Sequence, residues 1–326
     1  MGIFSRKPNV EKMVMEKNVE GLFKSLKYKN GDARTKNIAM DALQKIAESR
    51  GTVEPFIQAL KDENDNVREF AALCLAHTED NRAVDALIEA LNDKSALVRK
   101  AAANTLGLIG NTKAIESLIQ ALKDEDKEVR KVAGNSLAIL GDSSVEPLLM
   151  ALKDKNEFTR QEAATTLGKL GDKKAVEPLC AALRDGDLNV RTSAALALYD
   201  ISDERAVEPL IAVLQNPAPM DLGWRKDDEW WARSAAIEAL GKIGDVRALE
   251  PIIAVLKDDE KLDTRKIAAK TLGDFQNKQA MEPLISALRE NDKDLRQFAA
   301  KSLGKITGQD FGQDAARWQQ WWKKQE

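Results

Sequence analysis

Apolar side chains recur along this chain at spacings of three and four residues, in short segments separated by polar stretches. Such spacing places the apolar side chains on one face of an α-helix, so the pattern predicts amphipathic helices throughout. The helices come in pairs: VEPFIQALKDENDNVREFAALCL from Val53 returns from Val84 as VDALIEALNDKSALVRKAAANTL. Further copies begin at Ile115, Val145, Val176, Val207, Leu249 and Met281, with a degenerate first copy from Val19.

The period of these copies predicts the architecture. Most copies begin 30 to 32 residues after the previous one, and the step from Val207 to Leu249 is 42 residues. A fixed period in this range is typical of stacked repeats, in which one helix pair cannot bury its apolar face alone and neighbours share a core. We therefore expect an all-α solenoid of about nine two-helix repeats.

Residues at the helix ends support the same assignment. Proline recurs in the first turn of the first helix, where its missing N–H costs no hydrogen bond: Pro55, Pro147, Pro178, Pro209, Pro251 and Pro283. Four residues before the recurrent arginine of most repeats stands a residue suited to cap the second helix: Asn64, Ser95, Asp126, Asn156, Asp187 and Asp292. Glycine often follows that helix, where a left-handed cap is favourable: Gly110, Gly141, Gly171 and Gly244.

An aspartate and an arginine also recur. The arginines are Arg68, Arg99, Arg130, Arg160, Arg191, Arg233, Arg265 and Arg296, and the aspartates are Asp62, Asp93, Asp124, Asp154, Asp185 and Asp258. We expect each guanidinium group to bind a carboxylate of a neighbouring turn with two parallel hydrogen bonds, a geometry that lysine cannot supply. The alternative is a row of anion-binding arginines.

With AVEPLIAVL, VRKAAANTLGLIGN and these Asp/Arg pairs, the chain resembles the HEAT-repeat family, and most closely the PBS-lyase HEAT-like subgroup of microbes. The resemblance covers residues 19 to about 307 and implies an armadillo-type α–α superhelix. We expect residues 1–18 to form an N-terminal capping segment, residues 19–307 the HEAT-like solenoid, and residues 308–326 a capping helix rich in tryptophan. In that helix Trp318, Trp321 and Trp322 share one face.

The composition narrows the classes of function. The chain has 50 basic and 53 acidic residues, so its charges nearly cancel, and a general nucleic-acid binder is not expected. Cys74 and Cys180 fit reduced thiols rather than a disulfide framework, and no apolar run is long enough to span a membrane, so we expect a cytoplasmic protein. His77 is the single histidine, which cannot supply the several His-Glu pairs of the di-iron hydroxylases similar in fold. We expect no metal, no cofactor and no catalytic residue.

A partner-binding surface is expected where the second helices line the concave face of the solenoid. Side chains one, two, five and nine residues after the recurrent arginine should project there. The candidates are Phe70, Leu73, Lys100, Leu108, Val132, Ile139, Leu196, Lys242, Lys266, Lys270, Phe298 and Lys301, with Tyr199 one residue before the ninth position. The N-terminal half of this face is expected to be apolar. Its C-terminal end is expected to have a basic bias, with Lys242, Lys266, Lys270, Lys301 and Lys305 against Glu238 and Asp274. The alternative is that the apolar residues lie between adjacent helices and the lysines form a solvated face.

The seventh repeat carries an insertion at about residues 216–229, between its two helices. Trp224 lies in this insertion beside Arg225 and Lys226 and is a further candidate for partner contact, against packing within its own loop. Trp230 and Trp231 fall at the start of the helix that follows.

The sequence favours a non-catalytic scaffold or adaptor, expected to be a monomer, that binds a protein partner in its concave groove. The alternative, implied by the resemblance alone, is a bilin (phycobilisome) lyase-type chaperone or enzyme for chromophore attachment. No residue can be named for that chemistry.

Overall fold

The computed structural model describes residues 9–27, 33–48, 52–78, 80–215 and 230–325, and in these ranges every regular element is a helix. The chain divides into two compact units, residues 1–147 and 148–326, which are described separately. The division falls within helix α10, Val145–Ala151. We name the first helix of each repeat the A helix and the second the B helix.

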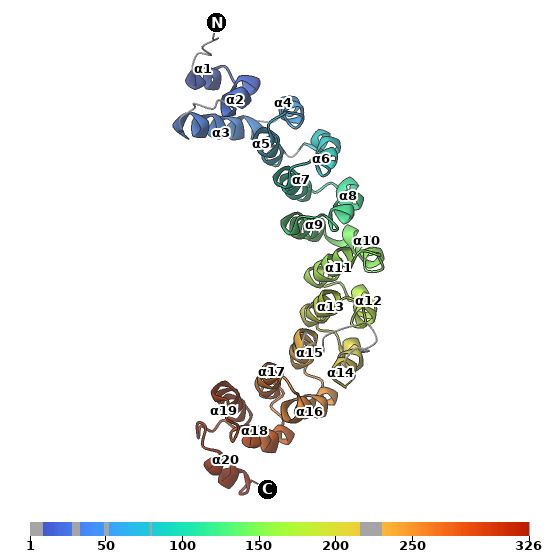
Figure 1. Cartoon of the computed structure of the whole chain (residues 1–326), viewed down its shortest axis with the longest axis vertical. Helices are drawn as coiled ribbons and strands as arrows, with labels where there is room; N and C mark the ends of the chain where they lie inside the picture. The colour runs from blue at the N-terminus through green and yellow to red at the C-terminus, as the bar shows by residue number, and fades with distance from the viewer. Residues whose placement is uncertain (1–8, 28–32, 49–51, 79, 216–229, 326) are drawn as a thin grey trace. The chain divides into compact units, whose positions relative to one another are not determined.

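The first unit begins with a short helix and continues with alternating A and B helices. Its helices are α1 (Val10–Met15), α2 (Val19–Leu26), α3 (Ala33–Ala47), α4 (Glu54–Ala59), α5 (Asp65–Leu75), α6 (Val84–Ala90), α7 (Ala96–Ile109), α8 (Ile115–Ala121) and α9 (Lys127–Ile139). The B helices α5, α7 and α9 stack side by side in one layer, and the A helices α4, α6 and α8 form the other (Figure 1).

The second unit repeats this arrangement. Its helices are α11 (Glu157–Leu170), α12 (Val176–Ala182), α13 (Leu188–Ile201), α14 (Val207–Gln215), α15 (Trp230–Ile243), α16 (Leu249–Asp258), α17 (Leu262–Leu272), α18 (Met281–Ala287), α19 (Lys293–Thr307) and α20 (Ala315–Trp322). The B helices α11, α13, α15, α17 and α19 each contact the next (Figure 1). Nine A–B pairs occur in the described ranges, which confirms the predicted all-α solenoid of two-helix repeats.

The predicted helix ends are largely confirmed. Asn64, Asp126, Asn156, Asp187 and Asp292 each accept hydrogen bonds from backbone N–H groups of the B helix they precede. Ser95 occupies the same place without a side-chain cap bond. The left-handed glycine ends at Gly110 and Gly171 are present, with φ of 76° and 70°, where a residue with a side chain would be strained.

Adjacent B helices lie unusually close because small residues face one another between them. A Cβ atom added to Gly107 would lie 2.7 Å from Cβ of Ser136, and one added to Gly241 would lie 2.3 Å from Cγ2 of Thr271. Hydroxyl groups at these contacts donate to carbonyl oxygens of the preceding B helix: Thr105 to Ala72 at 2.8 Å, Ser136 to Ala103 at 2.8 Å, and Ser302 to Ala269 at 2.7 Å. Within each unit the B helices therefore form a continuous wall.

Both ends of the described chain carry a short helix on the repeats. Val10 of α1 is buried, and α1 contacts α2 and α3. At the other end α20 contacts α18, and the fully buried Trp318 donates its indole N–H to the Gly312 carbonyl at 2.9 Å. These contacts support the two capping segments expected from the sequence, whose boundaries stay predictions.

Candidate partner-binding wall

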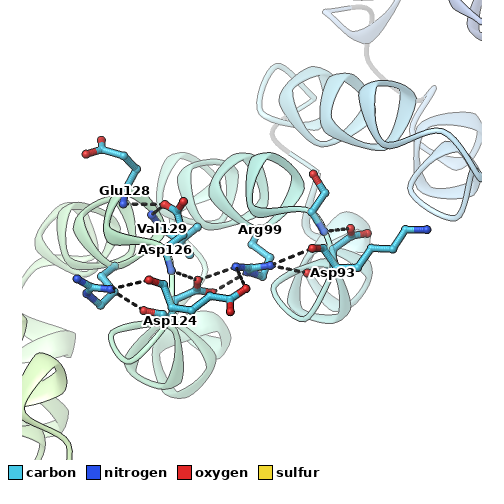
Figure 2. Close-up of polar contacts among 10 residues, drawn as sticks. Asp93, Arg99, Asp124, Asp126, Glu128 and Val129 are labelled. Carbon is cyan, nitrogen blue, oxygen red and sulfur yellow. Dashed lines mark hydrogen bonds and ion pairs between the residues drawn. The ribbon is translucent and has the colours of Figure 1, made fainter.

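The recurrent arginines fix each B helix to the turn of the next repeat. Nε and Nη2 of Arg99 donate to the two carboxylate oxygens of Asp124, each at 2.7 Å, while Nη1 donates to the carbonyl of Asp93 at 2.9 Å (Figure 2). Arg68 binds Asp93 and Arg160 binds Asp185 in the same two-point manner. This confirms the expected pairing for these arginines, whose guanidinium groups are thus not free to form an anion-binding row.

One partner in this series differs from the expectation. Arg233 donates to Asp259 at 3.2 Å rather than to Asp258. The repeat from Leu249 has one extra residue before its arginine, Arg265, so the aspartate six residues before that arginine is Asp259. The carboxylate partner thus lies six residues before the next repeat's arginine. Glu290 lies at this position before Arg296, and it binds Arg265 at 2.7 Å.

These pairs are shielded from water, yet the hydrogen bonds within each pair outweigh the effect of burial on the pKa values of Asp93 and Arg99. Burial alone would raise the pKa of Asp93, but hydrogen bonds from Arg68 and from the Ser95 N–H, with the charge of Arg68, outweigh burial and lower it. The pKa of Arg99 is raised above its usual value, chiefly by its hydrogen bonds to Asp124. The pairs therefore hold the wall together in their ionised form.

In the first unit the wall presents an apolar row. Leu73 on α5, Leu108 on α7 and Ile139 on α9 are all exposed, as expected, and the exposed fractions of Leu108 and Ile139 are 54% and 57%. Leu108 and Ile139 occupy the same place, nine residues after the arginine, on adjacent B helices. His77 holds this place after α5 and is exposed.

Other predicted wall residues are less accessible. Phe70, Lys100 and Val132 in the first unit and Phe298 in the second are half-buried. Phe70, Val132 and Phe298 lie two residues after the arginine, and side chains at this place are partly covered. These three residues are therefore only partly accessible on the wall.

In the second unit the expected basic bias is largely cancelled by carboxylates. Lys266 is half-buried and lies 3.3 Å from Asp292, 3.6 Å from Asp263 and 3.7 Å from Asp294. Lys270 lies 3.7 Å from Glu238, and Lys305 lies 2.7 Å from Asp274. Most of these carboxylates come from neighbouring repeats, whereas Asp263 lies on the same helix as Lys266.

Two wall residues of the second unit keep exposed apolar surface, Leu196 and Tyr199 on α13. The ammonium group of Lys242 on α15 lies 4.3 Å from the centre of the Tyr199 ring. A shallow cavity of about 250 Å³ opens beside this pair. Lys301 on α19 is exposed, and it takes part in no ion pair among residues the structure describes.

The insertion at 216–229, with Trp224, lies outside the described residues, so its expected contact with a partner stays a prediction. The residues that follow it are described: Trp230 and Trp231 stack with ring centres 4.0 Å apart at the start of α15.

The described residues offer little for catalysis. Burial raises the pKa of Cys74 to about 12 and is the main cause that raises the pKa of Cys180 to about 11, so both thiols stay protonated and weakly nucleophilic at neutral pH. Within the described ranges, no group of three or more His, Cys, Asp and Glu side chains has the geometry to hold a metal ion. None of the described helices is both long enough and apolar enough to cross a membrane.

Comparison with known families identifies the class of this chain. A model of HEAT repeats matches residues 19–96, 53–138, 84–158, 145–222 and 249–317, which together cover most of the sequence, and the chain therefore belongs to the HEAT-repeat family. A model of the PBS lyase HEAT-like repeat matches residues 232–258, which span most of α15 and all of α16. No curated protein sequence matches the chain.

One similar solved structure shows the fold of this chain. A chain in the structure of Kap95p with RanGDP is 14% identical with a TM-score of 0.61, over 93% of this chain and 49% of that one. Human deoxyhypusine hydroxylase is 24% identical with a TM-score of 0.35, over 82% of this chain and 99% of that one. The CpcE and CpcF complex of phycocyanin lyase from Nostoc sp. PCC7120 is 24% identical with a TM-score of 0.36, over 80% and 95%. At these identities the first likeness shows the fold alone, and the other two are too loose to bear on function.

Proposed function

We propose that this chain is a non-catalytic scaffold that binds a protein partner on its wall of B helices. The observation that carries the proposal is the exposed apolar pair Leu108 and Ile139, at equivalent places on adjacent B helices. Exposed apolar side chains that gather on one surface mark interaction sites, and stacked repeats use such extended surfaces to bind other proteins. Membership of the HEAT-repeat family supports the same function, because these repeats typically bind proteins.

The test compares two double variants as baits in the native host. Leu108→Asp with Ile139→Asp places two charges in the apolar row. Met150→Asp with Val246→Asp is the matched control, since these side chains are 69% and 62% exposed but lie on an A helix and on a turn before one. Phe70 is left intact because it is half-buried, and a charge there would disturb folding.

We expect a partner that the wild type and the control retain, and that the wall variant loses by at least tenfold in quantitative mass spectrometry. The interaction is then measured with both purified proteins. Equal retention by the wall variant and the wild type would show that the row is not the binding surface.

Chromophore attachment of the bilin-lyase type has no arrangement of side chains in its favour among the described residues, and we do not propose it. A visible absorbance that survives denaturation, after this protein is mixed with free bilin and an acceptor apoprotein, would reinstate it.

A further inference from the structure

Tyr199 is a large residue at a position of the repeat where the other repeats have a small one. The eighth residue after the recurrent arginine is small in every other repeat with this arginine: Ala76, Gly107, Ala138, Gly168, Gly241, Gly273 and Gly304. At several of these glycines an added Cβ would collide with the neighbouring helix. A tyrosine cannot occupy that space, so its ring lies out on the wall, where it is exposed. Tyr199 is 38% exposed, so a substantial part of its surface is open on the wall.

Lys242 beside this ring carries a charge that the wall does not neutralise. Its ammonium group faces the Tyr199 ring and lies 3.4 Å from the carbonyl oxygen of Asp200. Among residues the structure describes, no carboxylate oxygen lies within ion-pair distance of it, while Lys270 and Lys305 have Glu238 and Asp274. The carboxylate of Asp200 lies toward α11, with one oxygen 3.5 Å from where a Cβ of Gly168 would be.

The cavity beside Lys242 has the size and charge for one acidic side chain. It is lined by Tyr199, Glu238, Gly241, Lys242, Lys270 and Asp274, and its volume of about 250 Å³ lies below the range of roughly 300–1,000 Å³ usual for small-molecule sites. Two carboxylates line this cavity, and each already has an ammonium partner: Glu238 pairs with Lys270, and Asp274 pairs with Lys305. The ammonium group of Lys242 therefore leaves one positive charge. A single carboxylate balances that charge, whereas a phosphate dianion would be repelled by Glu238 and Asp274.

We propose that this cavity receives a glutamate or aspartate side chain of the protein partner, next to an apolar residue that lies on Leu196 and Tyr199. The partner's carboxylate accepts hydrogen bonds from the ammonium group of Lys242, which keeps its contact with the Tyr199 ring. Leu196 is exposed one turn before Tyr199 on the same helix, so the two give exposed apolar surface on one side of α13, and Tyr199 also lines the cavity. This inference rests on the proposed scaffold function and names the chemistry of one contact.

The test uses small probes on the whole protein, so its outcome is independent of finding the partner. Lysines are ¹³C-dimethylated, which keeps their charge, and the Lys242 signal is assigned from the spectrum of Lys242→Gln. N-acetyl-leucyl-glutamate amide is titrated, with N-acetyl-leucyl-glutamine amide as the neutral probe of the same shape and inorganic phosphate as the anion control.

We expect a saturable shift of the Lys242 signal with the glutamate probe, about fivefold weaker affinity for the glutamine probe, and an unmoved Lys301 signal. Tyr199→Ala should weaken the glutamate probe while circular dichroism stays that of the wild type. Equal binding of the two peptides, no shift of the Lys242 signal, or equally tight binding of phosphate would each overturn the inference. If the probe binds but the host pull-down yields no partner, the scaffold proposal fails and the site stands.

Discussion

At the scale of single residues, the recurrent arginine joins two repeats at once. Its guanidinium group closes its own A–B turn through backbone carbonyls and reaches the carboxylate of the next turn (Figure 2). The same carboxylate accepts a backbone N–H two residues later, as Asp124 does from Asp126 at 2.8 Å. Both charged groups are nearly buried, so water can solvate neither of them well if its partner is removed.

Replacing Asp124 with asparagine should test this. The variant keeps the shape of the side chain but leaves the buried Arg99 with only the exposed Glu125 as a counter-charge, so we expect the free energy of unfolding to fall by about 1.5–3 kcal/mol. The control is Asp85→Asn, which removes an exposed ion pair with Lys113 in the same unit and should cost about 0–1 kcal/mol. Urea unfolding followed by circular dichroism measures both. Equal losses for the two variants would contradict the role of burial.

The sequence predicted this pairing because residue type and spacing alone define it. It missed Asp259, because one inserted residue moves the partner of Arg233. It also overestimated the charge near Lys266, because Asp292 and Asp294 belong to the next repeat and only the packed structure brings them close to this lysine.

At the scale of the element, the turn before several A helices contains a second recurring ion pair, between an aspartate and an arginine. Asp80, Asp203 and Asp245 each cap a short 3₁₀ turn and bind the arginine two residues later. Hydrogen bonds from the side chain and backbone of Arg205 lower the pKa of Asp203 to about 2. Because the folded pKa lies below the unfolded value of about 3.9, the ionised carboxylate stabilises the fold above that value.

The pH dependence of stability should reveal this turn. Between pH 5 and 7 we expect a constant difference in unfolding free energy between the wild type and Asp203→Asn. The difference should shrink as the pH falls from about 4 towards 2, where the native carboxylate becomes protonated. Urea titrations at a series of pH values measure it, and Arg205→Gln should show a weaker pH dependence, because it removes the guanidinium donor and its charge while the backbone N–H remains. A difference that does not change with pH would refute this cause.

Element packing also explains why the wall was only partly predictable. Helical spacing placed Leu108, Ile139 and Leu196 correctly on the exposed face. It could not show that Phe70 and Val132 are half-buried, because this depends on the packed structure around each side chain. The sequence does show Tyr199 as a bulky residue at a position where the other repeats have glycine or alanine. The significance of this position emerges only from the structure, in which several of these glycines contact a neighbouring B helix.

At the scale of the whole molecule, the second unit is a stack in which α13, α15 and α17 each contact a B helix on both sides, whereas α19 stands at the end of this layer. Stability in such arrays is a sum of repeat and interface contributions, so an uncovered end frays first. In the second unit α20 covers this end: Trp318 is fully buried, and its ring meets Phe311 edge-on at 4.8 Å. The amphipathic spacing of the terminal tryptophans was sufficient to predict this contact.

Trp318→Ala should therefore loosen the end of the second unit and leave its other repeats intact. Removing a buried tryptophan costs about 3–5 kcal/mol, and in a stack the loss should be local. Hydrogen exchange measured by mass spectrometry should show faster exchange in α18 and α19, while α11 and α13 keep their protection. Trp231→Ala is the matched control, because that tryptophan is 56% exposed and its loss should change little. Faster exchange spread evenly over all these helices would mean that the unit unfolds as one cooperative body, and that α20 stabilises the whole unit rather than closing its end.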